Sequence, residues 1–126
     1  MFIIDSSKTI HVTRGDIGSI SISATDSNNT TYTFRQGDIV RLMVFKKKAV
    51  NEVVLSKSIE ATPDTTEVNI NLTSEDTRIG DVINKPVDYW YEVELNPDTM
   101  PQTLIGYDED GPKVLRLYPE GVKTHE

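Results

Sequence analysis

The stretch that decides the fold runs from Val87 to Leu95 and reads Val87-Asp88-Tyr89-Trp90-Tyr91-Glu92-Val93-Glu94-Leu95. Its odd-numbered positions are all apolar or aromatic, whereas its even-numbered positions hold three acidic residues and Trp90. This alternation has the period of an extended strand, and the apolar types are those that favour strands. A helix would not place the odd-numbered side chains on one side. We therefore predict a central strand with one face in the core and Trp90 on the opposite face.

Further short segments of β-prone residues flank this stretch, separated by turn-forming residues about every 8 to 12 positions. We expect Phe2–Ile4 and Thr9–Val12 to form one broken edge strand. The other predicted strands are Gly18–Ala24, Tyr32–Phe34, Ile39–Phe45, Val53–Ile59, Glu67–Leu72, Thr103–Tyr107 and Lys113–Tyr118. This pattern predicts an all-β fold, an immunoglobulin-like antiparallel β-sandwich of about seven to nine short strands.

One short helical turn is expected before the central strand. Residues 73–78 begin with Thr73 and carry Asp76 three positions later, which resembles a capping box and predicts about one turn of helix near 74–78. In immunoglobulin-like sandwiches the chain crosses between the two sheets at this point, and a tyrosine near the start of the next strand closes the corner with a hydrogen bond. Tyr89 and Tyr91 are the candidates for that bond.

Composition narrows the classes of protein and of function. A chain of 126 residues fits one domain, spanning 1–126, with a polar tail that we expect to be frayed from about residue 119. The formal net charge of −7 argues against binding to nucleic acid or to an anionic membrane surface. The absence of cysteine excludes disulfides and thiolate metal sites. We expect no signal peptide, because Met1–Lys8 lacks a basic segment and a long apolar run, and no membrane insertion.

Three short motifs suggest chemistry but have simpler explanations. Arg14-Gly15-Asp16 spells an adhesion tripeptide, yet it lies where a turn between two strands is expected. Asp108-Glu109-Asp110-Gly111 resembles the opening of a calcium loop, but the rest of an EF-hand is missing, so a solvated hairpin turn is favoured over weak calcium binding. His11 and His125 are the two histidines and lie at opposite ends of the chain. We therefore predict no metal site, no cofactor and no catalytic residues; the protein is expected not to be an enzyme.

The strongest candidate site is a patch on the outer face of the sheet. If Ile39–Phe45 places Val40, Leu42 and Val44 in the core, then Arg41, Met43 and Phe45 point outward. Pairing of this strand with Val87–Leu95 would bring Trp90 beside them. Trp, Met and Arg are enriched at the centres of protein interfaces, so Trp90, Met43, Phe45 and Arg41 form a possible interface. The alternatives are that a loop or the N-terminal segment covers this patch, or that the faces of Ile39–Phe45 are reversed.

The order of these signals resembles a known family. The resemblance rests on five segments, which together extend from about Thr9 to Tyr118: Ile10-His11-Val12-Thr13-Arg14-Gly15-Asp16, Val40–Lys48, Val68–Thr77, Tyr89-Trp90-Tyr91-Glu92-Val93 and Thr103-Leu104-Ile105-Gly106. They are similar to the N-terminal domain of the upper baseplate proteins of phages and prophages of Gram-positive bacteria. Members of that family usually continue into a longer C-terminal region, whereas this chain ends at Glu126.

The resemblance implies a function in assembly. It implies an immunoglobulin-like module of the tail baseplate that binds other virion proteins, without catalysis or cofactor. The expected location is the virion, after synthesis in the cytoplasm of the bacterial host, and a homo-oligomer is possible. Two other classes stay open. A carbohydrate- or cell-surface-binding β-sandwich would stack sugars on Trp90 and Tyr107, aligned in one strip, and a hydrolase would need a pocket with paired carboxylates.

Overall fold

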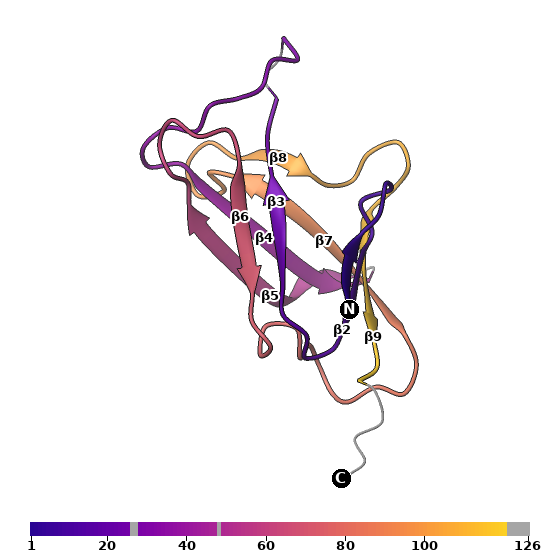
Figure 1. The fold of residues 1–126 in the computed structure, drawn as a ribbon. Coiled ribbons are helices and arrows are strands. Elements are labelled where there is room, and N and C mark those ends of the chain that lie inside the picture. The colour runs from indigo at the N-terminus through magenta and orange to yellow at the C-terminus, as the bar shows by residue number, and fades with distance from the viewer. Residues whose placement is uncertain (26–27, 48, 121–126) are drawn as a thin grey trace.

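The predicted central strand is β7, Val87–Leu95, and its neighbours build a structure of strands alone. The computed structural model describes residues 1–25, 28–47 and 49–120 and contains no helix within them. The strands of the described residues are β1 (Phe2–Ile4), β2 (Ile10–Thr13), β3 (Gly18–Ile22), β4 (Ile39–Lys46), β5 (Ala49–Glu60), β6 (Val68–Leu72), β7, β8 (Gln102–Ile105) and β9 (Lys113–Tyr118) (Figure 1). The all-β prediction is confirmed.

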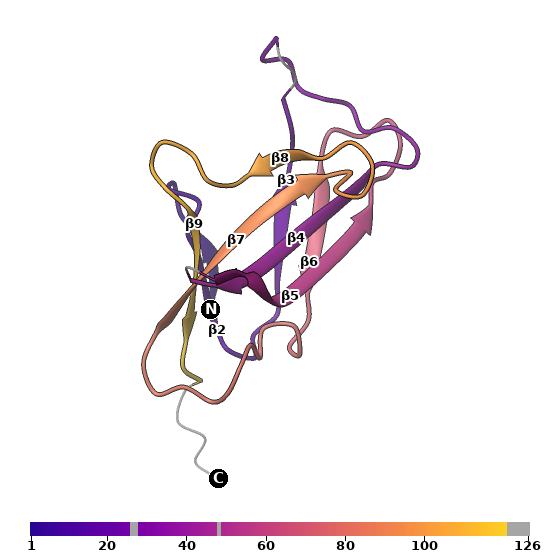
Figure 2. The same ribbon diagram turned by 180° about the vertical axis from the view of Figure 1, so that it is seen from behind.

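The strands form two layers of unequal size. The larger sheet has the order β1-β2-β9-β7-β4-β5, with β8 also paired to β7. The smaller sheet contains β3 and β6, which pair in antiparallel fashion and lie across one face of the larger sheet (Figures 1 and 2). All pairs are antiparallel except β2 with β9, which run parallel. The molecule is thus a β-sandwich.

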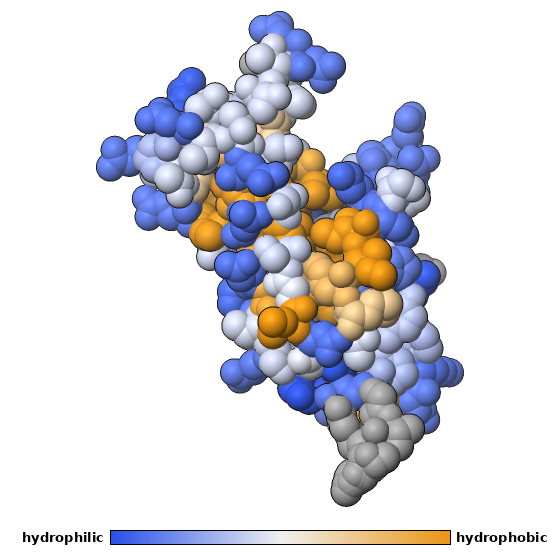
Figure 3. All heavy atoms as spheres, viewed as in Figure 1, coloured by the Kyte–Doolittle hydropathy of each residue, from blue (hydrophilic) through white to orange (hydrophobic). Residues whose placement is uncertain are grey.

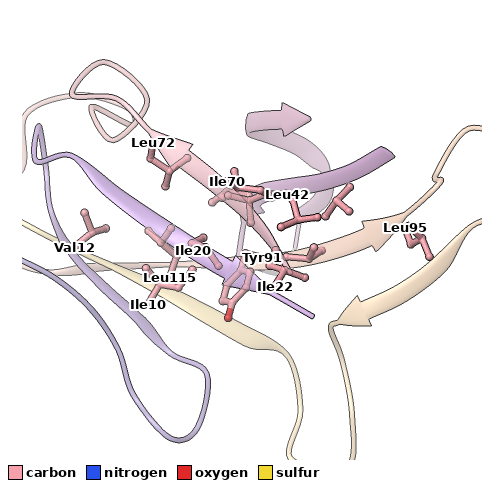
Figure 4. Close-up of a cluster of buried hydrophobic side chains, with 14 of the residues drawn as sticks. Ile10, Val12, Ile20, Ile22, Leu42, Ile70, Leu72, Tyr91, Leu95 and Leu115 are labelled. Atoms are coloured by element: carbon pink, nitrogen blue, oxygen red, sulfur yellow. The ribbon is translucent and has the colours of Figure 1, made fainter. Parts of the chain in front are cut away.

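The core lies between the two sheets. Ile20 and Ile22 of β3 and Ile70 and Leu72 of β6 point toward the larger sheet, where Leu42, Tyr91 and Leu115 meet them (Figure 4). Each of these side chains is at most 3% exposed, and full burial of one such aliphatic side chain contributes about 1.5–3 kcal/mol. Val40, Leu42 and Val44 are completely buried, as the alternation in β4 predicts. The faces of β4 were therefore assigned correctly.

The N-terminal prediction was wrong. β1 and β2 are not one broken strand but an antiparallel hairpin, with Phe2 opposite Val12 and Ile4 opposite Ile10. The carboxylate of Asp5 accepts hydrogen bonds from the backbone N–H groups of Ser7 and Thr9 and so closes the turn between them. The predicted strand Tyr32–Phe34 was also wrong.

The turn before β7 has the predicted capping box without a helix. The N–H of Thr73 donates to the Asp76 carboxylate at 2.9 Å, and the N–H of Asp76 donates to the Thr73 hydroxyl at 3.1 Å. The segment remains a turn over 74–77. The predicted hydrogen bond from a tyrosine of β7 to the segment that precedes β7 was wrong. The Tyr91 hydroxyl donates instead to the backbone carbonyl of Lys8 in the β1–β2 turn.

Two strands share one edge of β7. β4 pairs with β7 on one side along Tyr89–Leu95, while on the other side β9 pairs with Val87–Tyr91 and β8 with Val93–Leu95. β8 and β9 are thus two halves of an interrupted strand, and residues 106–112 leave the sheet between them (Figure 2). This interruption creates the pocket described below.

The beginning of the tail is anchored. Glu120 pairs with Arg78 at 2.8 Å and lies 3.6 Å from Arg14. The expectation that the tail is frayed from about residue 119 is therefore wrong for Glu120. Residues 121–126, to which the rest of that expectation applied, lie outside the described residues.

Candidate binding site

The four residues of the predicted patch lie together on the outer face of the larger sheet. Phe45 is directly opposite Trp90 in the β4–β7 pair, Met43 is opposite Glu92, and Arg41 is opposite Glu94. Paired residues of neighbouring strands point to the same face. Sequence reasoning placed Phe45 correctly beside Trp90, and Met43 and Arg41 on the same face further along β4. It did not include Glu92 and Glu94, which lie opposite Met43 and Arg41.

Part of this face is covered by the loop between β8 and β9, which was one of the alternatives considered. Phe45 is only 8% exposed although it lies outside the core cluster. A pocket of about 100 Å³ lies between the sheet and the loop. It is lined by Phe45, Trp90, Tyr91 and Glu92 of the sheet, and by Tyr107, Pro112 and Lys113 of the loop and of β9. The end of the patch at Phe45 and Trp90 therefore forms a small pocket, whereas Met43 and Arg41 do not line it.

Arg41 lies at the far end of the patch and is fully engaged. Its guanidinium donates to the Asp98 carboxylate at 2.8 and 3.3 Å and to the Ser58 hydroxyl at 2.9 Å. The hydrogen bond from Arg41 also holds the pKa of Asp98 below its usual value. Arg41 thus fastens the turn after β7 to β4 and β5, which is a structural contact and not a free interface group.

The pocket has aromatic walls and one carboxylate. The ring contacts within the described part of the chain are His11–Tyr118 and Tyr32–Phe34, so the rings of Phe45, Trp90 and Tyr107 do not stack on one another. Glu92 is half-buried and has no hydrogen bond or ion pair to any described residue. Burial raises the pKa of Glu92, and the charge of Glu94 raises it further.

The calcium-like motif forms a hairpin turn. Asp108 and Gly111 exchange two backbone hydrogen bonds, of 3.2 and 2.8 Å. The Asp108 carboxylate accepts from the N–H of Asp110 and from the Lys113 ammonium, at 2.9 and 2.7 Å. Its oxygens are thus occupied by protein donors. Across the described residues, no group of three His, Cys, Asp or Glu side chains could hold a metal ion.

The adhesion-like tripeptide is a turn, as predicted. Arg14 is buried and donates to the backbone carbonyl of Gly80 at 2.7 Å, and Asp16 pairs with the N-terminal ammonium of Met1. Such a buried arginine is not presented for recognition. His11 bonds to Asp5 and to the Tyr118 hydroxyl, whereas His125 lies outside the described residues.

A second exposed region was missed from the sequence. Ile3 and Ile4 of β1 are 54% and 36% exposed, and Ile17, which precedes β3, is 73% exposed. Hydrophobic side chains gather over the β1–β2 edge and the start of β3 (Figure 3). The run Phe2-Ile3-Ile4 could have indicated this exposure. Its three residues are all apolar, so a strand formed by them places apolar side chains on both of its faces. We call Ile3, Ile4 and Ile17 the N-terminal apolar edge.

Comparison of the chain with protein-family models, curated proteins and solved structures gives no significant match. The resemblance to upper baseplate proteins therefore has no support beyond the sequence segments themselves. No helix within the described residues is long and apolar enough to cross a membrane.

Proposed function

We propose that this chain is a non-enzymatic assembly module that binds another protein by strand addition at β1. The setting we propose is the tail baseplate of a phage or prophage, with other virion proteins as partners. The immunoglobulin-like assignment is part of this proposal. Two features support it. The sheet of β3 and β6 lies against the larger sheet, which contains β9, β7, β4 and β5, and β2 pairs in parallel with β9.

The observation that carries the proposal is the unprotected end of the larger sheet. Within the part of the chain that the structure describes, β1 is the last strand in the order and pairs with β2 alone, so the backbone groups on its other side have no strand partner there. Its two exposed isoleucines and Ile17 supply apolar surface beside that edge. Protein sheets guard such an edge with charges, prolines, bulges or a very short strand. β1 is short, with three residues, but it carries neither charge nor proline, and an exposed edge of this kind is a template for an added strand.

The test is co-expression with the tail proteins encoded by neighbouring genes, followed by affinity isolation of the tagged chain. We expect a complex with the wild type that is lost when lysine replaces isoleucine in Ile3→Lys. The matched control is Val82→Lys, because Val82 is 80% exposed in the loop before β7, away from the sheet edge. The proposal fails if no tail protein is isolated, or if the two variants bind equally well.

A carbohydrate- or cell-surface-binding function is the second candidate. It is favoured by the placement of Trp90 and Tyr107, the two aromatics expected to stack on sugars, around the same pocket. The volume of about 100 Å³ argues against it, because it leaves little room for a sugar ring. A glycan array probed with wild type and with Tyr107→Ala tests this function: binding lost in the variant supports it, and no binding at all rejects it.

A further inference from the structure

We propose that the pocket between β4, β7 and the β8–β9 loop binds a fully alkylated ammonium group, such as the head group of choline. Phe45, Trp90 and Tyr107 supply three aromatic walls and Glu92 supplies the negative charge. This inference goes beyond assembly through β1 and uses a different surface of the molecule.

The arrangement of the rings is the first argument. Phe45 and Trp90 are direct cross-strand neighbours, a position in which aromatic side chains commonly contact each other. No stacked or edge-on ring pair joins Phe45, Trp90 and Tyr107, and all three line the same pocket of about 100 Å³. Aromatic faces attract cations through their quadrupole, and cages of several rings recognise quaternary ammonium groups.

The charges around the pocket are the second argument. Glu92 has no cationic partner among the described residues, and Glu94 adds negative potential from the same face of β7. Lys113, which also lines the pocket, is paired with Asp108 at 2.7 Å, which offsets its positive charge. The chain as a whole carries a formal net charge of −7, which also attracts cations.

The chemistry of the lining selects the kind of cation. A primary ammonium carries three N–H donors that need acceptors when they leave water. The side chains of the pocket offer a single carboxylate, at Glu92, so most of those donors would lose hydrogen bonds on binding. A quaternary ammonium has no donor to satisfy and presents only methyl groups to the rings. The volume of about 100 Å³ also suits a compact head group better than a sugar ring.

The experiment uses the single tryptophan of the chain, Trp90, as an intrinsic fluorescent probe. The purified protein is titrated with choline chloride at constant ionic strength, and the heat of binding is measured in parallel by calorimetry. The comparison ligands are 3,3-dimethyl-1-butanol, which has the shape of choline without its charge, methylammonium chloride and methyl glucoside. We expect saturable binding of choline with a Kd on the order of millimolar, and at least about threefold weaker binding of the other three.

Two pairs of variants separate the site from nonspecific effects. Tyr107→Ala should weaken choline binding about three- to tenfold, while Tyr107→Phe, which keeps the ring, should change it less than twofold. Tyr107 is 76% exposed, so neither change should disturb the fold. Glu92→Gln should weaken choline binding more than Glu94→Gln, which removes the same charge two residues along the strand and outside the pocket.

Three results would overturn the proposal. Equal binding of choline and 3,3-dimethyl-1-butanol would mean an apolar pocket without recognition of charge. Tighter binding of methyl glucoside or of methylammonium would assign the pocket to sugars or to primary amines. Unchanged fluorescence and no heat with choline up to 100 mM, about a hundred times the expected Kd, would mean no site. Ile3→Lys, which tests the assembly function, should leave choline binding unchanged, so the two proposals can fail separately.

Discussion

The two ends of the larger sheet are built in opposite ways. β5 is 12 residues long, and its exposed positions include Glu52, which pairs with Lys46, and Glu60. Lys57 interrupts its apolar side and pairs with Asp76 at 2.7 Å. β1 has three residues, all apolar, and no charge. Charged side chains and irregular pairing prevent edge strands from associating. The comparison indicates that β5 is a closed end of the sheet and β1 an end available for contact.

The anchoring of the two ends differs as well. The β5 end is held by polar groups: the backbone carbonyl of Asp38 accepts from Ala61 after β5, and the Asp38 side chain bonds to Asn96 after β7. The β1 end is held by the Phe2 ring, which lies against Gly18, and by the Tyr91 hydroxyl bond to the Lys8 carbonyl. Each anchor should contribute to the free energy of unfolding, and its removal should lower that free energy.

The largest loss is expected for Asp38→Ala. The buried Asp38 carboxylate accepts hydrogen bonds from the Tyr32 hydroxyl, the Arg35 N–H and the Asn96 amide, at 2.7, 2.9 and 3.0 Å. Hydrogen bonds to a charged group contribute about 1.5–3 kcal/mol and leave unsatisfied donors when broken, so we expect a loss of about 3 kcal/mol in urea unfolding. The control Asp98→Ala removes an exposed ion pair and should lower stability far less.

The contribution of Asp38 should also depend on pH. Burial raises the pKa of Asp38, but its hydrogen bonds from Arg35, Asn96 and Tyr32 outweigh this and lower the pKa below 3.8. A carboxyl whose pKa is depressed in the folded state stabilises the fold above its unfolded pKa, and this stabilisation is lost as the pH falls through the folded value. The stability difference between wild type and Asp38→Asn should therefore be constant from pH 7 to 5 and shrink below 3.8. A constant difference down to pH 2 would contradict the assignment.

The next largest effect is expected for Gly18→Ala at the β1 end. A Cβ on Gly18 would overlap the Phe2 ring, so the ring must leave its place or the strands must shift. Overpacking of this kind costs about 1–3 kcal/mol, and we expect about 2 kcal/mol in urea unfolding together with faster amide exchange in β1. Phe2→Ala removes the obstacle. The double variant should therefore lose less free energy of unfolding than the two single variants lose together. Strict additivity would show that the ring does not anchor β1.

The comparison also shows what the sequence could predict. Alternation in β4 and β7 placed Val44 and Val93 in the core and Phe45 and Trp90 on the outer face, because the period of a strand alone determines its faces. That reasoning depends only on neighbours along the chain. It therefore assigns the faces of a strand correctly where the alternation is not interrupted by a bulge.

Features that depend on distant parts of the chain were missed. Ile10 of β2 pairs with Leu115 of β9, near the other end of the sequence, and no local signal announces this parallel pair or the hairpin that precedes it. The composition of 108–112 indicated a turn, but not that the loop would lie over Phe45 and Trp90. The pocket exists because the strand opposite Glu92 is interrupted, and this follows only from tertiary pairing.

A smaller loss is expected for Tyr91→Phe. The buried Tyr91 hydroxyl, whose pKa burial raises, donates to the Lys8 carbonyl and joins β7 to the β1–β2 turn. Removal of one neutral hydrogen bond costs about 1 kcal/mol, and amide exchange should quicken in the β1–β2 turn. Tyr89→Phe is the control on the same face of β7, because its hydroxyl bonds to no described residue; it should change stability by less than about 0.5 kcal/mol. Equal effects of the two changes would remove this anchor.

The smallest effect on stability, and the most direct test of the comparison, comes from exchanging the characters of the two edges. Ile3→Lys places a charge on an exposed position of β1 and should alter the free energy of unfolding by less than about 0.5 kcal/mol. Lys57→Ile removes the guarding charge of β5 and a partly exposed ion pair, at a cost of less than about 1 kcal/mol. Light scattering over a range of concentrations should then show self-association created by Lys57→Ile. Any association of the wild type should be abolished by Ile3→Lys, because a charge on an edge strand prevents it from pairing with another molecule. If Lys57→Ile remains as monomeric as Ile3→Lys, the length and bulges of β5 protect it without help from Lys57, and the contrast between the two edges lies in their backbones.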